Sequence, residues 1–370
     1  MCITIEYKGG YIMTFSHVSP QLFKQSPFSN TYADKYTPDM IRSAYNYTDK
    51  YGGDGITVAV VTAFANVHIE NDVREFSSSF GLPEPNIEIV RTSQAVNPDA
   101  VWNREAALDV EWIHASAPKA KLVLITPNSA VLENLMECVL LAKEYSADIV
   151  SLSFGLQEKY VKSFYEDKLS DDIIYLAAAG DIPGVCLYPS SSPMFGGIGG
   201  TNLDIDKKGR RISEETAWEN GGGGVSSVFS IPDYQNIFRP IAFMSQSMRA
   251  IPDASFFSSG SAGAAVYFTS QRLSESGWIS AEGTSLGTPM WAGIAAMCLE
   301  ASGKKLSGHD RFMRFLYALA GTTAYSNVGD DYIDIVSGGN GVFYATKGYD
   351  FCTGLGSPNV ANIVSAAEKE

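Results

Sequence analysis

Residues 121–153 read KLVLITPNSAVLENLMECVLLAKEYSADIVSLS, in which two apolar runs flank a longer amphipathic stretch. The runs at 121–126 and 148–153 have the length and the β-branched content of buried strands, and residues 131–145 have the length of a helix. A strand, a helix and a strand in succession are typical of two parallel strands joined by a crossover helix. This stretch therefore predicts a parallel sheet that carries helices.

The same alternation extends in both directions from this stretch. Further strands are expected at 56–61 and 173–178, and continuous apolar strands of this kind are buried on both faces of a sheet. Helices are expected at 38–45, 71–79 and 100–116, and again near 288–300 and 309–320. Between them, residues 200–280 are expected to form glycine-rich and aromatic loops. The sequence predicts an α/β fold with a mostly parallel central sheet and helices on both faces.

The domain organisation follows from the absence of an internal repeat or an obvious linker. Residues 1–35 form a polar N-terminal lead-in, and residues 36–370 are expected to form one large domain, since single α/β domains reach this size. The composition, 45% hydrophobic over 370 residues, is sufficient for a large core.

The charge of the chain limits its partners. The formal net charge is −14, which argues against nucleic-acid binding because that function favours a basic face. A protein rich in carboxylates also tolerates low pH, where its net charge moves towards zero. No apolar run is long enough to span a bilayer, and the most apolar stretch, 288–299, is expected to be a buried helix. Neither a nucleic acid nor a membrane is an expected partner.

The five cysteines are widely scattered and form no C-x-x-C pair. A zinc cluster is therefore not expected, and the thiols are predicted to be buried as small apolar side chains. Residues 1–6, MCITIE, lack the basic region and apolar stretch of a signal peptide.

Ser285 lies in the sequence GTSLG at 283–287, directly before the apolar helix. Glycines permit a sharp turn and a helix N-terminus offers amide donors, so this is a common way to present a nucleophile. A helix cap followed by a buried helix would explain the same residues. The motif also matches the nucleophile elbow of α/β-hydrolases, which requires an acid and then a histidine downstream. Only His309 follows, with no aspartate before it, so the chain order weighs against that arrangement.

Glu105 and Asp109 lie four residues apart among alanines and a leucine in the expected helix at 100–116. This spacing places both carboxyl groups on one helix face, where they could share a proton. Such a pair can provide a base for a serine and a partner that orients the base. A solvated acidic face is the alternative, and the small apolar residues between the acids weigh against it.

Asp181 follows Gly180 at the end of the expected strand 173–178. Side chains in this position lie at the carboxyl edge of the sheet, where open α/β folds bind ligands. A protonated Asp181 could donate a hydrogen bond to a developing oxyanion. A turn aspartate that caps the next segment is an equal alternative on local grounds.

These three segments, in this order, resemble the sedolisin family, the serine-carboxyl peptidases with a subtilisin-like fold, over about residues 37–358. The resemblance implies that Ser285 is the nucleophile, Glu105 the base, Asp109 its partner and Asp181 the oxyanion donor. It implies a hydrolase of proteins or peptides with an acidic pH optimum, acting as a monomer. Whether it is an endopeptidase or a tripeptidyl-peptidase stays open.

The resemblance also implies a C-terminal calcium loop that holds one structural Ca²⁺. Hard oxygen ligands and a glycine-rich loop suit this ion. The ligands carried over are two carboxylates and three backbone oxygens: Asp334, Ile335, Thr346, Gly348 and Asp350.

Two alternatives to a peptidase remain at this stage. The lead-in is shorter than the family's usual prosegment, and Glu282 stands where the family usually has serine, so an inactive relative that binds peptides is one of them. The chain is either a processed form or a member that folds without a prosegment. An esterase that uses the GTSLG elbow is the second alternative. The resemblance implies secretion, whereas the absence of a visible signal peptide leaves a cytoplasmic location open.

Overall fold

The computed structural model describes residues 2–7, 11–17, 28–93, 99–270, 276–321 and 330–370. Within them, the largest sheet has the strand order β11-β10-β8-β6-β3-β5-β4, and β14 also pairs with β10. All neighbouring strands in this sheet are parallel except β10 and β11. The strands are β3 Thr57–Val61, β4 Asn86–Arg91, β5 Lys121–Thr126, β6 Ile149–Leu152, β8 Ile174–Ala178, β10 Gly196–Asn202, β11 Thr216–Ala217 and β14 Ala254–Ser259.

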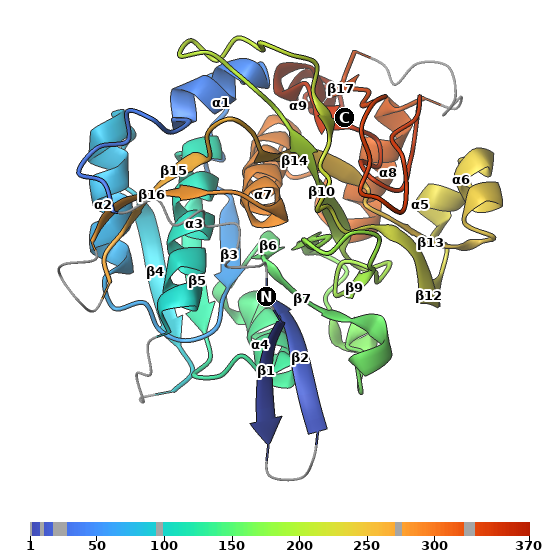
Figure 1. Ribbon diagram of the computed structural model, residues 1–370, viewed down its shortest axis with the longest axis horizontal. Coiled ribbons are helices and arrows are strands. Elements are labelled where there is room, and N and C mark those ends of the chain that lie inside the picture. The colour runs from blue at the N-terminus through green and yellow to red at the C-terminus, as the bar shows by residue number, and fades with distance from the viewer. Residues whose placement is uncertain (1, 8–10, 18–27, 94–98, 271–275, 322–329) are drawn as a thin grey trace.

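Helices cover both faces of this sheet (Figure 1). Val58 and Val60 of β3 belong to the core that also contains residues of α3 and α7, whereas Ala59 and Val61 belong to the core that contains residues of α4. Alternate side chains of one strand thus enter two different cores, as expected for a strand buried on both faces. The helices are α1 Pro38–Ala44, α2 Ile69–Phe80, α3 Ala100–Ser116, α4 Leu132–Leu141, α5 Asp233–Asn236, α6 Arg239–Met244, α7 Thr284–Ala301, α8 His309–Leu319 and α9 Val360–Ala367.

The helices α3 and α7 pack closely side by side on one face of the sheet (Figure 1). The hydroxyl of Ser116 donates a 3.0 Å hydrogen bond to the carbonyl oxygen of Met290. A Cβ atom at Gly293 would lie 2.3 Å from the Ser116 side chain, so only glycine permits this approach. This close packing fixes the relative position of the two helices that carry Glu105 and Ser285.

Smaller sheets surround the central one. A four-stranded sheet has the order β1-β2-β7-β9, in which β2 pairs antiparallel with the first residues of β7 and β9 with its last residues. Three two-stranded sheets pair β12 with β13, β15 with β16, and β17 with β18. The strands are β1 Cys2–Tyr7, β2 Tyr11–His17, β7 Phe154–Gln157, β9 Leu187–Tyr188, β12 Gly224–Ser230, β13 Met248–Ile251, β15 Ala264–Phe268, β16 Gly277–Ala281, β17 Tyr332–Ile333 and β18 Ser357–Pro358.

The predicted α/β class, with its mostly parallel sheet and helices on both faces, is confirmed. The prediction of loops throughout 200–280 is wrong, since β12 to β16 lie there. Four of these strands pair antiparallel, β12 with β13 and β15 with β16, and glycines in β12 and β16 obscure their strand pattern. The edge strand β4 was missed because none of its residues is fully buried. The predicted helix 131–145 ends as α4 at Leu141 and continues as a 3₁₀ turn, Ala142–Tyr145.

Three of the cysteines, Cys138, Cys298 and Cys352, are buried as predicted. Cys186 is half-buried, and the side chain of Cys2 lies outside the described part of the chain. Among the helices described, none combines the length and the apolarity required of a membrane span.

Candidate active site

Ser285 is the second residue of α7 and is fully buried. The residue before the helix, Gly283, has φ +121°, a backbone conformation that favours glycine. Its amide donates to the carbonyl oxygen of Ser258 at the end of β14, which anchors the turn to the central sheet. The glycine turn and the helix start therefore hold the Ser285 hydroxyl at a fixed place beside the sheet.

The Ser285 hydroxyl donates a short hydrogen bond to Oε1 of Glu105. Glu105 lies in the second turn of α3 and is 3% exposed. A serine that donates to a buried carboxylate has its proton acceptor already in place. The packing of α3 against α7 thus brings together residues that are 180 positions apart.

Asp109 lies one turn further along α3 and is fully buried. Burial raises the pKa of both carboxyl groups well above their usual values, and the neighbouring charge of Asp109 raises the pKa of Glu105 further. A hydrogen bond from Ser153 opposes the shift at Asp109, and one from Ser285 opposes it at Glu105. Two buried acids at this spacing favour a state with one shared negative charge.

Asp181 lies beyond β8, next to the start of α7. Its Oδ1 accepts from the amide of Thr284 at 3.0 Å and from the Thr284 hydroxyl at 2.8 Å. The same hydroxyl accepts from the amide of Gly180 at 3.2 Å, and Gly180 has φ +103°. A side chain at Gly180 would collide with Leu187 at 2.3 Å. Asp181 is thereby held beside the start of α7, next to Ser285, and its charge also raises the pKa of Glu105.

The four residues expected from the sequence, Glu105, Asp109, Asp181 and Ser285, therefore form one cluster. Two other residues that shape it, Ser153 and Thr284, were missed. Ser153 donates a 2.6 Å hydrogen bond to Asp109, and Thr284 holds Asp181. The available signals were a polar residue at the end of a buried strand and the threonine directly before Ser285.

Other residues noted in the sequence have different contacts. The carboxylate of Glu282 accepts a 3.4 Å hydrogen bond from Ser259 of β14. His114 has its Nε2 2.9 Å from the carbonyl oxygen of Pro83. Burial lowers the pKa of His309 to about 3, so this side chain is neutral. The Ser285 hydroxyl is thus directed at the carboxylate of Glu105.

The expected calcium loop forms a compact turn in which carboxylates face the backbone. Both oxygens of Asp334 accept from the amide of Gly348, at 3.0 and 3.2 Å, and Oδ2 of Asp350 accepts from the amide of Thr346 at 3.0 Å. Burial raises the pKa of both acids, to about 6 for Asp350. Half-buried and buried carboxylates in a loop of backbone carbonyls offer the hard oxygen ligands that Ca²⁺ prefers, so the donor set fits this ion.

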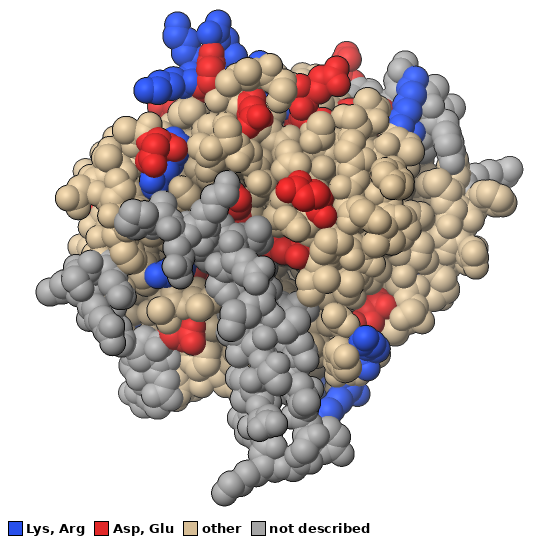
Figure 2. Space-filling model, in the orientation of Figure 1, with Lys and Arg blue, Asp and Glu red and all other residues tan. Residues whose placement is uncertain are grey.

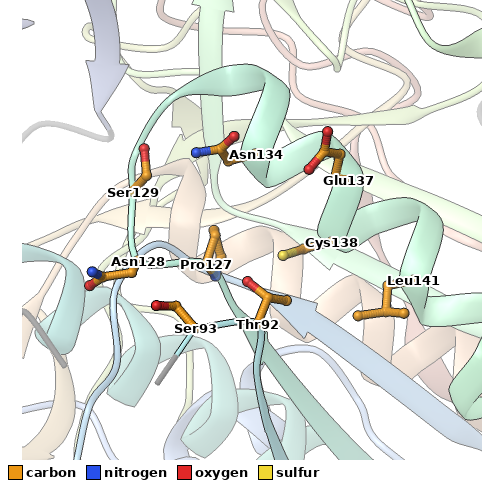
Figure 3. Close-up of a pocket in the computed structure, with 9 residues that line it drawn as sticks. All are labelled: Thr92, Ser93, Pro127, Asn128, Ser129, Asn134, Glu137, Cys138 and Leu141. Atoms are coloured by element: carbon orange, nitrogen blue, oxygen red, sulfur yellow. The ribbon is translucent and has the colours of Figure 1, made fainter. Parts of the chain in front are cut away.

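A separate pocket of about 450 Å³ lies at the carboxyl ends of β4 and β5, beside α4 (Figure 3). Polar side chains such as Asn128, Asn134 and Glu137 line it together with Cys138. None of the four clustered residues lines this pocket, so we assign it no part in the chemistry.

Acidic side chains are spread over the face of the molecule shown in Figure 2, including its centre, and Lys and Arg lie mainly towards the rim. A group of Lys and Arg side chains lies at the upper edge of this face, next to acidic side chains. The prediction that nucleic acid is not a partner stays a prediction.

The parallel sheet, with a buried serine and three acids at its carboxyl edge, defines an α/β protein of the subtilisin-like class. The structure of Pseudomonas sedolisin, a serine-carboxyl proteinase complexed with two molecules of pseudo-iodotyrostatin, has the same fold. Its TM-score is 0.78 at 21% identity, over 91% of this chain and 99% of that chain.

Two relatives extend the similarity to sequence. Kumamolisin from Bacillus sp. (strain MN-32) is 27% identical over 90% of this chain and 63% of its own length. Tripeptidyl-peptidase 1 from Bos taurus is 26% identical over 87% of this chain and 62% of its own length. No protein-family model matches the chain. The chain is thus similar in sequence and in fold to peptidases of the sedolisin type, and it spans less than two thirds of the length of these relatives.

Proposed function

We propose that the protein is an acid-acting serine-carboxyl peptidase that hydrolyses peptide bonds of proteins or peptides. The observation that carries this proposal is the hydrogen bond from the Ser285 hydroxyl to the buried carboxylate of Glu105, with Asp109 and Asp181 beside it. A buried serine that only capped α7 would not require three acids around it. Similarity in fold to a serine-carboxyl proteinase, and in sequence to kumamolisin and tripeptidyl-peptidase 1, supports the same conclusion.

In the proposed mechanism, Glu105 accepts the proton of Ser285 as Oγ attacks the carbonyl carbon of the substrate. Asp109 shares the charge of Glu105 and keeps it basic. The protonated carboxyl of Asp181 donates to the oxyanion of the tetrahedral intermediate. Glu105 then gives its proton to the leaving amine as the C–N bond breaks. Water then attacks the carbonyl carbon of the resulting ester while Glu105 accepts a proton from the water. Glu105 returns this proton to Oγ of Ser285 as the ester bond breaks, which releases the serine.

Low pH is required by this division of roles. Asp181 can donate a hydrogen bond only while its carboxyl group is protonated, so activity should fall as rising pH removes that proton. The pair Glu105 and Asp109 must lose one proton to become a base, so activity should also fall at the lowest pH. Together, these two requirements predict that activity plotted against pH is bell-shaped, with its maximum below pH 7.

Asp181→Asn is expected to weaken the decline of kcat at higher pH. The asparagine amide donates a hydrogen bond at every pH, so the step that depends on a protonated acid disappears. Asp181→Ala, which has no donor, should reduce kcat by about 100- to 1,000-fold at the acidic optimum, where the wild-type carboxyl group is protonated. Steady-state cleavage of a peptide across the acidic and neutral range measures both effects. A high-pH decline that is unchanged in Asp181→Asn would argue against the oxyanion role.

We also propose that the loop of Asp334, Ile335, Thr346, Gly348 and Asp350 binds one structural Ca²⁺. Chelation is then expected to lower the melting temperature, on the order of 5 °C, because an ion that binds only the folded state stabilises it. Asp350→Asn should remove this difference between calcium and chelator. Asp330→Asn, an exposed acid in the same part of the chain, should retain it. Equal melting with calcium and with chelator in the unsubstituted protein would refute the calcium site.

A further inference from the structure

Ser153 connects the central sheet to the acid pair. It lies between β6 and β7, and its side chain is buried. The residue before it, Leu152, pairs with Ala177 of β8, so the backbone that carries Ser153 is fixed by the sheet. The Ser153 hydroxyl donates a 2.6 Å hydrogen bond to Oδ1 of Asp109. The sheet therefore places a hydrogen-bond donor on one oxygen of a fully buried carboxyl group.

The other oxygen of Asp109 has little to stabilise a charge. Its Oδ2 has no hydrogen-bond partner among the residues the structure describes. Burial raises the pKa of Asp109, and the Ser153 hydrogen bond is the influence that lowers it. A buried carboxylate without donors takes up a proton instead of remaining charged. Ser153 is thus the described group that favours the charged form of Asp109.

The charge on Asp109 matters because it acts on Glu105. The groups that influence Glu105 are burial, Asp109 on the same helix, Ser285 on α7 and Asp181 beyond β8. Asp109 and Asp181 both raise the pKa of Glu105, and Ser285 lowers it. Because the pair carries one negative charge, a group that stabilises this charge lowers the pH above which Glu105 can accept the serine proton.

We propose that Ser153 is a positioning residue that orients Asp109 and stabilises the single negative charge that Asp109 shares with Glu105, so that the pair can accept the proton of Ser285. This inference rests on the proposed peptidase mechanism and adds to it a residue that acts through Asp109 without touching substrate. It connects the strand β6 of the central sheet to the base strength of the active site.

Ser153→Ala tests the proposal through kcat, KM and the pH profile. We expect kcat to fall about 10-fold or more with little change in KM, because substrate contacts are unaffected. Without the hydrogen bond, the anion of the acid pair is less stable and forms at a higher pH. The low-pH limb of the profile should therefore move upward by about one pH unit. Ser153→Thr, which keeps the hydroxyl, should have a kcat and a low-pH limb close to those of the wild type.

Ser151→Ala is the matched control. Ser151 is fully buried two residues earlier in β6, and its hydroxyl has no hydrogen-bond partner among the described residues. Its removal deletes the same atom without breaking a hydrogen bond, so wild-type kcat and pH profile are expected. If Ser153→Ala is too unstable to assay, Ser153→Cys keeps the volume with a weaker donor and should move the limb in the same direction.

Three results would overturn the proposal. The first is a low-pH limb that does not move in Ser153→Ala or in its substitute Ser153→Cys, and the second is an equal loss of kcat in Ser153→Ala and Ser151→Ala. The third is a Ser153→Thr variant that melts at the wild-type temperature but does not regain activity. Failure of the peptidase mechanism itself is a separate outcome. It would appear as cleavage that persists in Ser285→Ala, whereas an inactive Ser285→Ala with an unaffected Ser153→Ala would reject only the role of Ser153.

Discussion

Ser285→Ala is expected to abolish the cleavage of a denatured protein between about pH 3 and pH 8 while the protein remains folded. The substitution removes the atom that forms the acyl-enzyme, so the residual rate comes only from binding and oxyanion stabilisation. Loss of a serine nucleophile costs kcat on the order of a million-fold in a well-studied peptidase. Release of peptides, followed by mass spectrometry, measures this loss directly.

The matched control for this substitution is Ser191→Ala. Ser191 is also fully buried, and its hydroxyl has no hydrogen-bond partner in the described part of the chain. The control therefore deletes a buried hydroxyl elsewhere in the molecule and should leave cleavage unchanged. Acidic cleavage that survives in Ser285→Ala would mean that another group is the nucleophile or that a contaminant is active.

Glu105→Gln is expected to produce the second large loss, on the order of 100- to 10,000-fold in kcat, with KM little changed. Glutamine has nearly the same shape and can still accept a hydrogen bond from Ser285, but it cannot take the proton. The loss should persist at every pH, because no change of protonation restores a base at this position. Rates measured across the pH profile distinguish this result from a simple displacement of the optimum.

Glu111→Gln provides the control for Glu105→Gln. Glu111 is a fully buried acid on the same helix, and its Oε2 accepts a 3.0 Å hydrogen bond from the amide of Tyr267. Its pKa is raised by burial and by Asp72, so it resembles Glu105 electrostatically. It has no role in the proposed mechanism, and kcat should stay near the wild-type value. An equal loss in both variants would point to damage to α3 as the cause.

The central part of the fold could be predicted because its strands are short continuous apolar runs and its helices have clear lengths. Strand β5 and helix α3 begin and end at the predicted residues. The edge strand β4 could not be found in this way, since it is only partly buried and its polar residues interrupt the pattern. The hairpin of β15 and β16 depends on pairing between segments, which local composition does not reveal.

The candidate site, like the fold, could be predicted from the sequence only in part. A spacing of four could place Glu105 and Asp109 on one helix face, but only the family resemblance joined them to Ser285 and Asp181. The structure adds the packing of α3 on α7 and the hydrogen bonds of Ser153 and Thr284. These contacts link residues up to 180 positions apart, and no local pattern encodes such distances. The calcium loop remains a prediction because its expected ligands include backbone oxygens, which every residue has.

The most direct test of the account is covalent labelling of the protein with a fluorophosphonate or peptide aldehyde at about pH 4, followed by mapping of the modified residue. Both reagents require an activated nucleophile, so the test separates an enzyme from an inactive relative of the same fold. The account predicts one adduct, on Ser285, that is lost in Ser285→Ala and greatly slowed in Glu105→Gln. No adduct on folded, calcium-loaded protein, or an adduct on another residue, would contradict it.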